Sequence, residues 1–257
     1  MLLRRVIQHV RQQEWTAIGI DFVIVVMGVF IGLQVSNWNT AKQQQERANT
    51  YSQRLLAELK IEYDYANSLY DYNIATLEAG NIAYLGLSGE KPLNDDVTLI
   101  NAFRASQYNW YERRRSAFDE IVASGALSLI PSAELRETAI GMYSTPIFEI
   151  MRLEGQSSDY RRLFRETLTP ASHESLRQTC GDREEDLGDK NPNILTLSYT
   201  CKTELSQEVV KKEVDALRAD PNLLRALKLR NAQNAGRAYD IESVLRTLGM
   251  DNLYSKK

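Results

Sequence analysis

The pattern of apolar and polar positions separates one uninterrupted apolar segment from a long amphipathic remainder. Residues 17–35 contain only two strongly polar side chains, Asp21 and Gln34. As a helix this segment spans about 28 Å, close to the hydrocarbon thickness of a bilayer. Trp15 and Trp38 flank it, where aromatic residues meet the membrane interfaces. The pattern predicts three parts: a leader at residues 1–15, a single transmembrane helix at residues 16–38 and a soluble domain at residues 39–257.

A cleaved signal peptide is the alternative interpretation of the apolar segment. Signal peptides have a shorter apolar core, which is followed by a small-residue cleavage site. Here the core is longer, and residues 34–38 (QVSNW) contain no A-x-A pattern. We therefore expect an anchor that is retained in the mature chain.

Charged residues on either side of the anchor favour one orientation. The leader holds three arginines against Glu14, whereas residues 36–50 hold Lys42 and Arg47 against Glu46. The more basic side of a membrane helix tends to remain in the cytoplasm. The small excess of arginines therefore favours a cytoplasmic N terminus.

The two cysteines, Cys180 and Cys201, agree with that orientation. Both lie in a stretch rich in turn-forming residues, at 169–203. A disulfide between them suits an oxidising compartment and would stabilise the fold by about 3 kcal/mol in the chain-entropy model. Two buried free thiols are the alternative, and no C-x-x-C pair supports a redox motif or a zinc site. We expect a disulfide and a periplasmic body.

One face of the predicted anchor is suited to packing against another membrane helix. Gly28 and Gly32 form a G-x-x-x-G pair, and at about 100° per residue they share a face with Asp21. Small residues let a second backbone approach closely, and a carboxylate near the bilayer edge requires a partner or water. We expect helix association through this face. The alternative is a plain anchor, with Asp21 protonated or at the interface.

The remainder of the chain has helical periodicity. From residue 39 to about residue 87, apolar residues recur every three or four positions, and no proline or glycine occurs before Gly80. The anchor helix is therefore expected to continue outward as a stalk. Further helices are expected after a cap at Asp95 or Asp96, at 116–124, after Ser132, from Pro146 to Leu168, near Leu205, and from Asp220-Pro221 to Gly249.

These elements predict an all-α protein, in which one N-terminal transmembrane helix continues into a periplasmic antiparallel helical bundle with a disulfide-containing loop. The first and last long helices of the bundle are expected to lie side by side. The last helix carries Ala232, Ala235 and Ala238, which suit close packing on a neighbour. Residues 194–199 form the one plausible strand, so we expect an extended loop or short hairpin there.

Two stretches resemble uncharacterised bacterial single-pass membrane-protein families (domain of unknown function). The first reads as an acidic residue, a β-branched run with glycine, then Gln-x-x-Asn-Trp-Asn, at Asp21, Gly28, Gly32, Gln34, Asn37, Trp38 and Asn39. The second is similar at Phe118, Ser124, Gly125, Leu127, Ile130, Glu134, Leu135, Arg136 and Tyr143. The resemblance implies a bacterial inner-membrane protein with a periplasmic helical body, and it implies no activity.

Residues that carry chemistry are sparse. The two histidines, His9 and His173, are far apart in the sequence, and no P-loop, G-x-S-x-G or G-x-G-x-x-G motif occurs. The carboxylates at 119–120 and 184–186 could be drawn as acid/base or calcium sites, but such residues are normal on solvated helix faces, and the group at 184–186 lacks the alternating ligand spacing of a calcium loop. The formal net charge of −3 gives no nucleic-acid footprint. We expect no enzyme, no cofactor and no metal site.

The strongest candidate interaction surface combines aromatic residues and arginines. Residues 110–115 place Trp110 and Tyr111 before Arg113, Arg114 and Arg115, and could bind an anionic ligand or an acidic partner. A helix junction with buried aromatics and solvated or paired arginines is the interpretation that we favour. Tyrosines also recur along the predicted stalk, where Tyr63 and Tyr70 are candidates for an interface and core packing is the alternative.

Two functions of different class are consistent with the sequence. The first is a non-enzymatic accessory or scaffold subunit of an inner-membrane complex, whose partners are lipid and other membrane subunits or further copies of the chain. The second is a periplasmic sensory ectodomain that binds a ligand and signals through a partner, since the leader leaves no room for a signalling domain.

Overall fold

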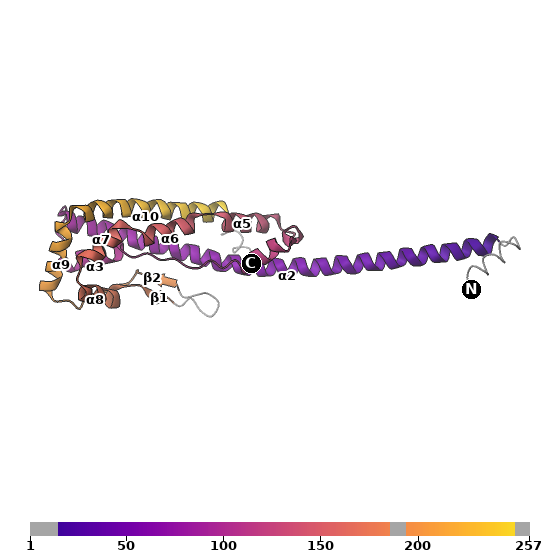
Figure 1. Ribbon diagram of the computed structural model, residues 1–257, viewed down its shortest axis with the longest axis horizontal. Coiled ribbons are helices and arrows are strands. Elements are labelled where there is room, and N and C mark those ends of the chain that lie inside the picture. Colours follow the sequence, from indigo (N-terminus) through magenta and orange to yellow (C-terminus); the bar gives the residue numbers. More distant parts are fainter. Residues whose placement is uncertain (1–14, 186–193, 250–257) are drawn as a thin grey trace. The chain divides into compact units, whose positions relative to one another are not determined.

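The computed structural model describes residues 15–185 and 194–249, and these are almost entirely helical (Figure 1). The predicted leader therefore lies outside the described residues, except for Trp15. The chain divides into two compact units. The anchor unit comprises residues 1–53 and 121–131, and the body unit comprises residues 54–120 and 132–257.

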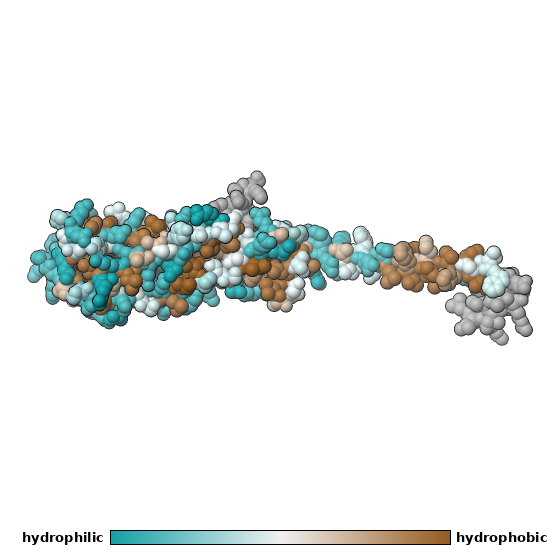
Figure 2. All heavy atoms as spheres, turned by 90° about the horizontal axis from the view of Figure 1, so that it is seen from above, coloured by the Kyte–Doolittle hydropathy of each residue, from teal (hydrophilic) through white to brown (hydrophobic). Residues whose placement is uncertain are grey.

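Helix α2 (Trp15–Ser88) is one continuous helix of 74 residues. It joins the predicted membrane segment to the predicted stalk without a break, as expected from the absence of proline. Within it, an 18-residue window has a mean hydropathy of 2.4, and none of that window is buried inside the protein. Figure 2 shows the hydrophobic side chains gathered along this first part of α2. By length and composition, α2 is the one helix among the described residues that could span a membrane.

In the body unit, the second part of α2 packs along α10 (Pro221–Thr247) (Figure 1). Asn234 Nδ2 donates a hydrogen bond to Thr76 Oγ1 at 3.2 Å. The two backbones approach closely at Gly80, where any side chain would overlap the amide of Asn231. The prediction that the first and last long helices lie side by side is confirmed.

The main hydrophobic core of the body unit lies beside α2 and α10. It includes Phe103 of α3 (Asp95–Ala105) and Phe164 of α7 (Asp159–Thr167), whose rings lie 6.3 Å apart. It continues through Val214 of α9 (Gln207–Ala219) to Leu227 of α10. These side chains are completely buried or nearly so.

The remaining elements are short, and side-chain caps fix several of their starts. They are α4 (Ser116–Ala123), η1 (Ala126–Leu129), α5 (Ala133–Ser144), α6 (Ile147–Gln156), α8 (Pro170–Cys180), β1 (Arg183–Glu185) and β2 (Ile194–Thr196). Ser132 caps α5 and Asp220 caps α10, both as predicted. The strands β1 and β2 pair antiparallel, which confirms a short hairpin in this region.

Several predicted boundaries are wrong. Asn94, and neither Asp95 nor Asp96, caps α3, because its side chain accepts the Asp96 N–H at 2.7 Å. The helix predicted from Pro146 to Leu168 is two helices, since Ser158 caps a new start at α7. Residues 170–180 are helical, with Pro170 in the first turn after the cap Thr169.

The alanine face predicted on the last helix is also wrong. Ala238 is buried, but Ala232 and Ala235 are exposed. Close packing of α10 on α2 depends on Gly80 instead. Because Gly80 has no side chain, the side chain of Asn231 on α10 can lie against the backbone of α2.

Candidate functional site

The segment that carries Trp110 to Arg115 has no regular secondary structure and joins α3 to α4. It is a junction between helices, but the prediction that its aromatic residues are buried is wrong for Trp110, which is exposed. Two carboxylates of α2, Glu58 and Glu62, hold it against the body unit. Glu58 is 7% exposed and Glu62 is completely buried. Charged side chains are rarely buried unless they are paired, so the contacts of these two residues define the site.

Glu62 binds the segment through both of its carboxylate oxygens. Arg113 Nε donates to Oε2 at 2.8 Å, and the backbone N–H of Arg114 donates to Oε1 at 2.7 Å. A further nitrogen of Arg113, Nη2, donates to the Met142 carbonyl oxygen at 2.9 Å. Arg113 is therefore engaged inside the protein, and its guanidinium lies 4.7 Å from the centre of the Phe148 ring.

Glu58 caps the N terminus of α4 from a distant part of the chain. It accepts the backbone N–H groups of Ala117 at 2.7 Å and Phe118 at 3.1 Å. A negative charge is favourable there because the first N–H groups of a helix lack partners within the helix. The Tyr143 hydroxyl lies 2.9 Å from Glu58 Oε1, and its ring stacks on Phe118. Glu58 thus joins α2, α4 and α5.

Burial dominates the titration of this site. It raises the pKa of Glu62 above the ordinary value, although the charge of Arg113 acts in the opposite direction. It also raises the pKa of Tyr143 and that of Tyr111, with the nearby charges of Glu58 and Glu62 adding to the effect. Both tyrosines therefore remain protonated at neutral pH.

A small cavity of about 210 Å³ lies beside the segment. Tyr111 lines it, and its buried hydroxyl has no hydrogen-bond partner among the described residues, although its ring stacks on Tyr65 at 4.0 Å. Trp110 is 51% exposed at the same cavity, with the guanidinium of Arg152 5.8 Å from its ring. Exposed tryptophan and arginine beside an unsatisfied hydroxyl are typical of protein interfaces.

The three arginines of the segment differ in what they leave free. Arg113 is paired with Glu62, and Arg115 forms an exposed pair with Asp119 at 2.9 Å. Arg114 is exposed and contributes its backbone N–H to Glu62. The groups at this segment that remain available for a partner are the exposed Trp110 and the Tyr111 hydroxyl.

The stalk tyrosines lie elsewhere on α2. Tyr63 and Tyr70 are half-buried, whereas Tyr72 is buried and donates to Asp182 at 2.6 Å. Tyr70 lines a groove of about 670 Å³ between α2 and strand β2. The structure therefore does not bring these two tyrosines together with the Trp110–Arg115 segment in one cavity.

The predicted face of the anchor is open on the described chain. Asp21, Gly28 and Gly32 are exposed, and a side chain at either glycine would meet no other atom within 4 Å. Nothing in the described residues covers this face, so it is available to lipid or to another helix.

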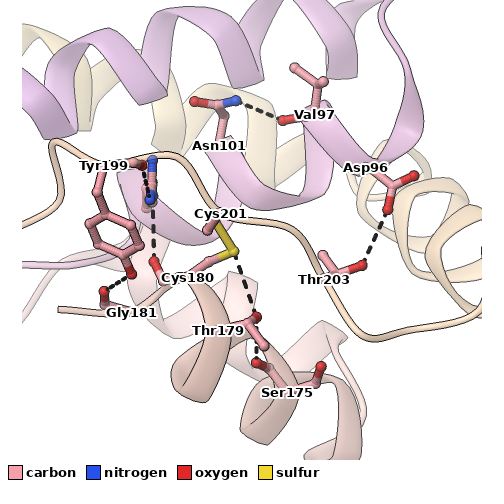
Figure 3. The surroundings of a disulfide bond; sticks show 11 residues. Asp96, Val97, Asn101, Ser175, Thr179, Cys180, Gly181, Tyr199, Cys201 and Thr203 are labelled. Atoms are coloured by element: carbon pink, nitrogen blue, oxygen red, sulfur yellow. Dashed lines mark hydrogen bonds between the residues drawn. A yellow bond between two sulfur atoms is a disulfide. The ribbon is translucent and has the colours of Figure 1, made fainter. Parts of the chain in front are cut away.

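The disulfide predicted between Cys180 and Cys201 is present (Figure 3). It joins the end of α8 to the segment that precedes α9. Arg104 reinforces the same junction, since it donates to the carbonyl oxygens of Cys180 at 3.4 Å and Tyr199 at 2.8 Å. Arg183 lies 3.7 Å from the centre of the Tyr199 ring. The bond therefore sits within a polar junction that also includes the hairpin.

Sequence reasoning missed Glu58 and Glu62, although a signal was present. Both fall in phase with Leu55, Leu59 and Ala66, so two carboxylates occupy the apolar face of a helix. Such a pattern indicates buried partners, and the nearby arginine run supplies one of them. The long separation between Glu62 and Arg113 is what kept the pair from being recognised.

Neither a metal site among the described residues nor a similar protein helps to interpret the candidate site. Among residues 15–185 and 194–249, no group of three or more His, Cys, Asp or Glu side chains could hold a metal ion. No protein-family model, curated protein or solved structure matches the chain. The site is therefore interpreted from its own geometry.

Proposed function

We propose that the chain is a membrane-anchored, non-enzymatic scaffold subunit of a bacterial inner-membrane assembly. Its N terminus lies in the cytoplasm and its body in the periplasm. The observation that carries the proposal is the first part of α2, which is apolar on all sides and buried against no part of the described chain. A helix that is hydrophobic all round requires surroundings other than water.

The partner contacts are assigned to two surfaces. In the membrane, the open face with Asp21, Gly28 and Gly32 packs against another helix, because small residues permit close approach. In the body unit, Trp110 and the cavity beside Tyr111 receive a partner side chain that accepts a hydrogen bond from the unsatisfied hydroxyl. These two surfaces support a role in assembly.

Co-purification in a mild detergent tests the membrane contact. We expect the natural chain to be recovered with stoichiometric subunits or as a defined homo-oligomer. The double variant Gly28→Leu/Gly32→Leu should lose that association, because two larger side chains would separate the helices. The matched control is Val23→Leu/Val26→Leu on the opposite face, which should retain it. A monodisperse monomer of the natural chain would contradict the proposal.

Accessibility labelling tests the orientation. In intact cells whose outer membrane has been made permeable, an impermeant reagent should label a cysteine introduced at the exposed position Leu229 of the body. The same reagent should not label one introduced at position 4 in the leader. The reverse pattern would contradict a periplasmic body.

A periplasmic ligand-binding ectodomain that signals through a partner is the second candidate. The cavities of the body unit are the observation that favours it, because the groove beside Tyr70 and a further cavity near α8 are large enough for small molecules. A ligand-dependent change in association with a partner would support this function.

A further inference from the structure

A cavity of about 460 Å³ lies in the body unit between the end of α3 and helices α7 and α8. Its volume falls within the range typical of small-molecule sites. None of the sequence motifs points to it. Its lining combines an apolar floor with a few polar and charged groups, which is the usual composition of a ligand site.

The floor of the cavity belongs to the hydrophobic core. Phe103 and Leu168 line it and are only 4% and 5% exposed. Pro170, at the start of α8, adds a further apolar surface. Phe164 lies behind the floor, with its ring edge-on to His173 at 5.7 Å. Packing therefore fixes the shape of the cavity.

One arginine at the cavity has no ion pair among the described residues. Arg165 forms none, whereas Arg162 on the same helix pairs with both Asp159 and Glu166. Arg177, also on the cavity wall, is held by Glu174 through two hydrogen bonds. The positive charge of Arg165 helps to lower the pKa of Arg161, after the larger effect of burial. The positive charge of Arg165 is therefore available to an anionic ligand.

Two further groups limit what the cavity accepts. The Gln107 amide nitrogen donates to the carbonyl oxygen of Phe103 at 3.2 Å and to Ser106 Oγ at 3.0 Å, which leaves the amide oxygen as an acceptor. His173 Nε2 lies 3.2 Å from the Arg165 carbonyl oxygen, so this nitrogen carries the proton. Neither side chain presents an anionic group that would compete with a ligand for Arg165.

We propose that this cavity binds a small organic carboxylate with an apolar body. A planar guanidinium binds a carboxylate through two parallel hydrogen bonds. Arg165 supplies the guanidinium at this cavity that forms no ion pair among the described residues. The body of the ligand packs on Phe103, Leu168 and Pro170, away from water. Glu174 on the wall disfavours a multiply charged phosphate, and the apolar floor gives an inorganic ion no contact.

The binding site goes beyond the scaffold function and does not depend on it. A ligand bound here would stabilise α7 and α8, and so the disulfide-linked side of the body unit, without contact with the membrane helix. Association through the anchor can be measured in the same samples, so failure of one proposal is distinguishable from failure of the other.

Fluorine NMR on the full chain in lipid nanodiscs tests the site. The probes are 4-fluorobenzoate and 6-fluorohexanoate, and empty nanodiscs report partitioning into lipid. We expect saturable binding of at least one probe to the protein. The neutral analogue 4-fluorobenzamide should bind at least about 10-fold more weakly than 4-fluorobenzoate, because it lacks the charge that Arg165 recognises.

The matched variants are Arg165→Gln and Arg162→Gln, two exposed positions on the same helix. Arg165→Gln should weaken carboxylate binding by at least about 10-fold, the loss of a hydrogen bond to a charged group. Arg162→Gln should leave the affinity within about 2-fold, since its carboxylate partners are outside the cavity. Equal losses in the two variants, or no saturable signal above empty nanodiscs, would overturn the assignment.

Discussion

Helix α2 has two parts, the apolar segment at residues 17–35 and the part in the body unit at residues 54–88. The two parts have the same backbone conformation and opposite surroundings. In the first part, Phe22 and Phe30 are 69% and 56% exposed, and Asp21 and Gln34 are the only strongly polar side chains of residues 17–35. In the second part, Leu55 and Leu59 are completely buried, and Glu58 and Glu62 share their face. Burial of apolar area stabilises a helix only where something covers it. The second part is covered by its own chain, whereas the first part requires a different molecule.

The comparison also separates two kinds of specificity. The second part of α2 recognises one particular segment through the directional bonds of Glu58 and Glu62. The first part presents a surface that lipid can satisfy without direction, and only Asp21, Gly28 and Gly32 distinguish one side of it. Substitutions in the two parts should therefore have very different consequences.

Removing a buried carboxylate should have the largest effect. Glu62→Ala leaves Arg113 and the Arg114 N–H without their partner, and we expect a loss of about 3–5 kcal/mol in the free energy of unfolding. Urea unfolding of the full chain, followed by circular dichroism, measures it. Glu120→Ala is the control, because its pair with Arg54 is exposed and should contribute less than about 1 kcal/mol. Similar losses in both variants would contradict the central role of Glu62.

Removing one leucine from each part of α2 tests the comparison directly. Leu59→Ala should destabilise the body unit by about 2–5 kcal/mol, because it opens a cavity in a packed interior. Leu33→Ala removes the same atoms from a side chain that is 58% exposed, and the unfolding midpoint should be unchanged. A matching loss at Leu33 would show that the first part also packs on the body.

Opening the disulfide should have an effect of comparable or smaller size. Cys180→Ser/Cys201→Ser should lower the free energy of unfolding by about 3 kcal/mol, because the unfolded chain regains the freedom of the closed loop. Thermal unfolding of the double variant, compared with the oxidised natural chain, measures it. The same measurement on the natural chain after reduction serves as a control and should agree with the variant.

The last prediction concerns the buried tyrosines at alkaline pH, and its effect is the smallest when it is counted for one tyrosine over one pH unit. Burial raises the pKa of Tyr111, Tyr143 and Tyr160 above the ordinary value. Their contribution to stability is therefore present below pH 10 and is lost as pH rises above it, by about 1.4 kcal/mol per pH unit and tyrosine. Tyrosinate absorbance and loss of helix should rise together. Full ionisation of all tyrosines before unfolding would contradict the burial effect.

Local chemistry made much of the fold predictable. The apolar segment, the uninterrupted stalk, the cap at Ser132 and the Asp220-Pro221 start all depend on neighbours in the sequence. Helix α8 was missed because Pro170 looks like a breaker, although after Thr169 it occupies the position where proline is tolerated. Element type was easier to predict than element boundaries.

The site was less predictable because its contacts join distant segments. Nothing near Glu62 in the sequence shows that Arg113 will reach it from residues 107–115, which form no regular element. The aromatic residues and arginines at 110–115 were singled out as a candidate interaction surface, and that role stays a prediction. Their division into buried, paired and available groups required the positions of α2, α5 and α6.

The composition of the anchor unit has a practical consequence for dissecting the chain. Residues 121–131 cluster with residues 1–53, although they are connected in sequence to the body, and within them Ile121 and Ile130 are almost completely buried. A water-soluble fragment that begins at Arg54 would keep residues 121–131 but lose the part of α2 that belongs to the same unit. A truncation that begins just after Trp38 would retain residues 39–53 together with residues 121–131, and would discard the leader and the apolar segment. The useful site for a protease cleavage sequence therefore lies nearer the membrane than the start of the body unit.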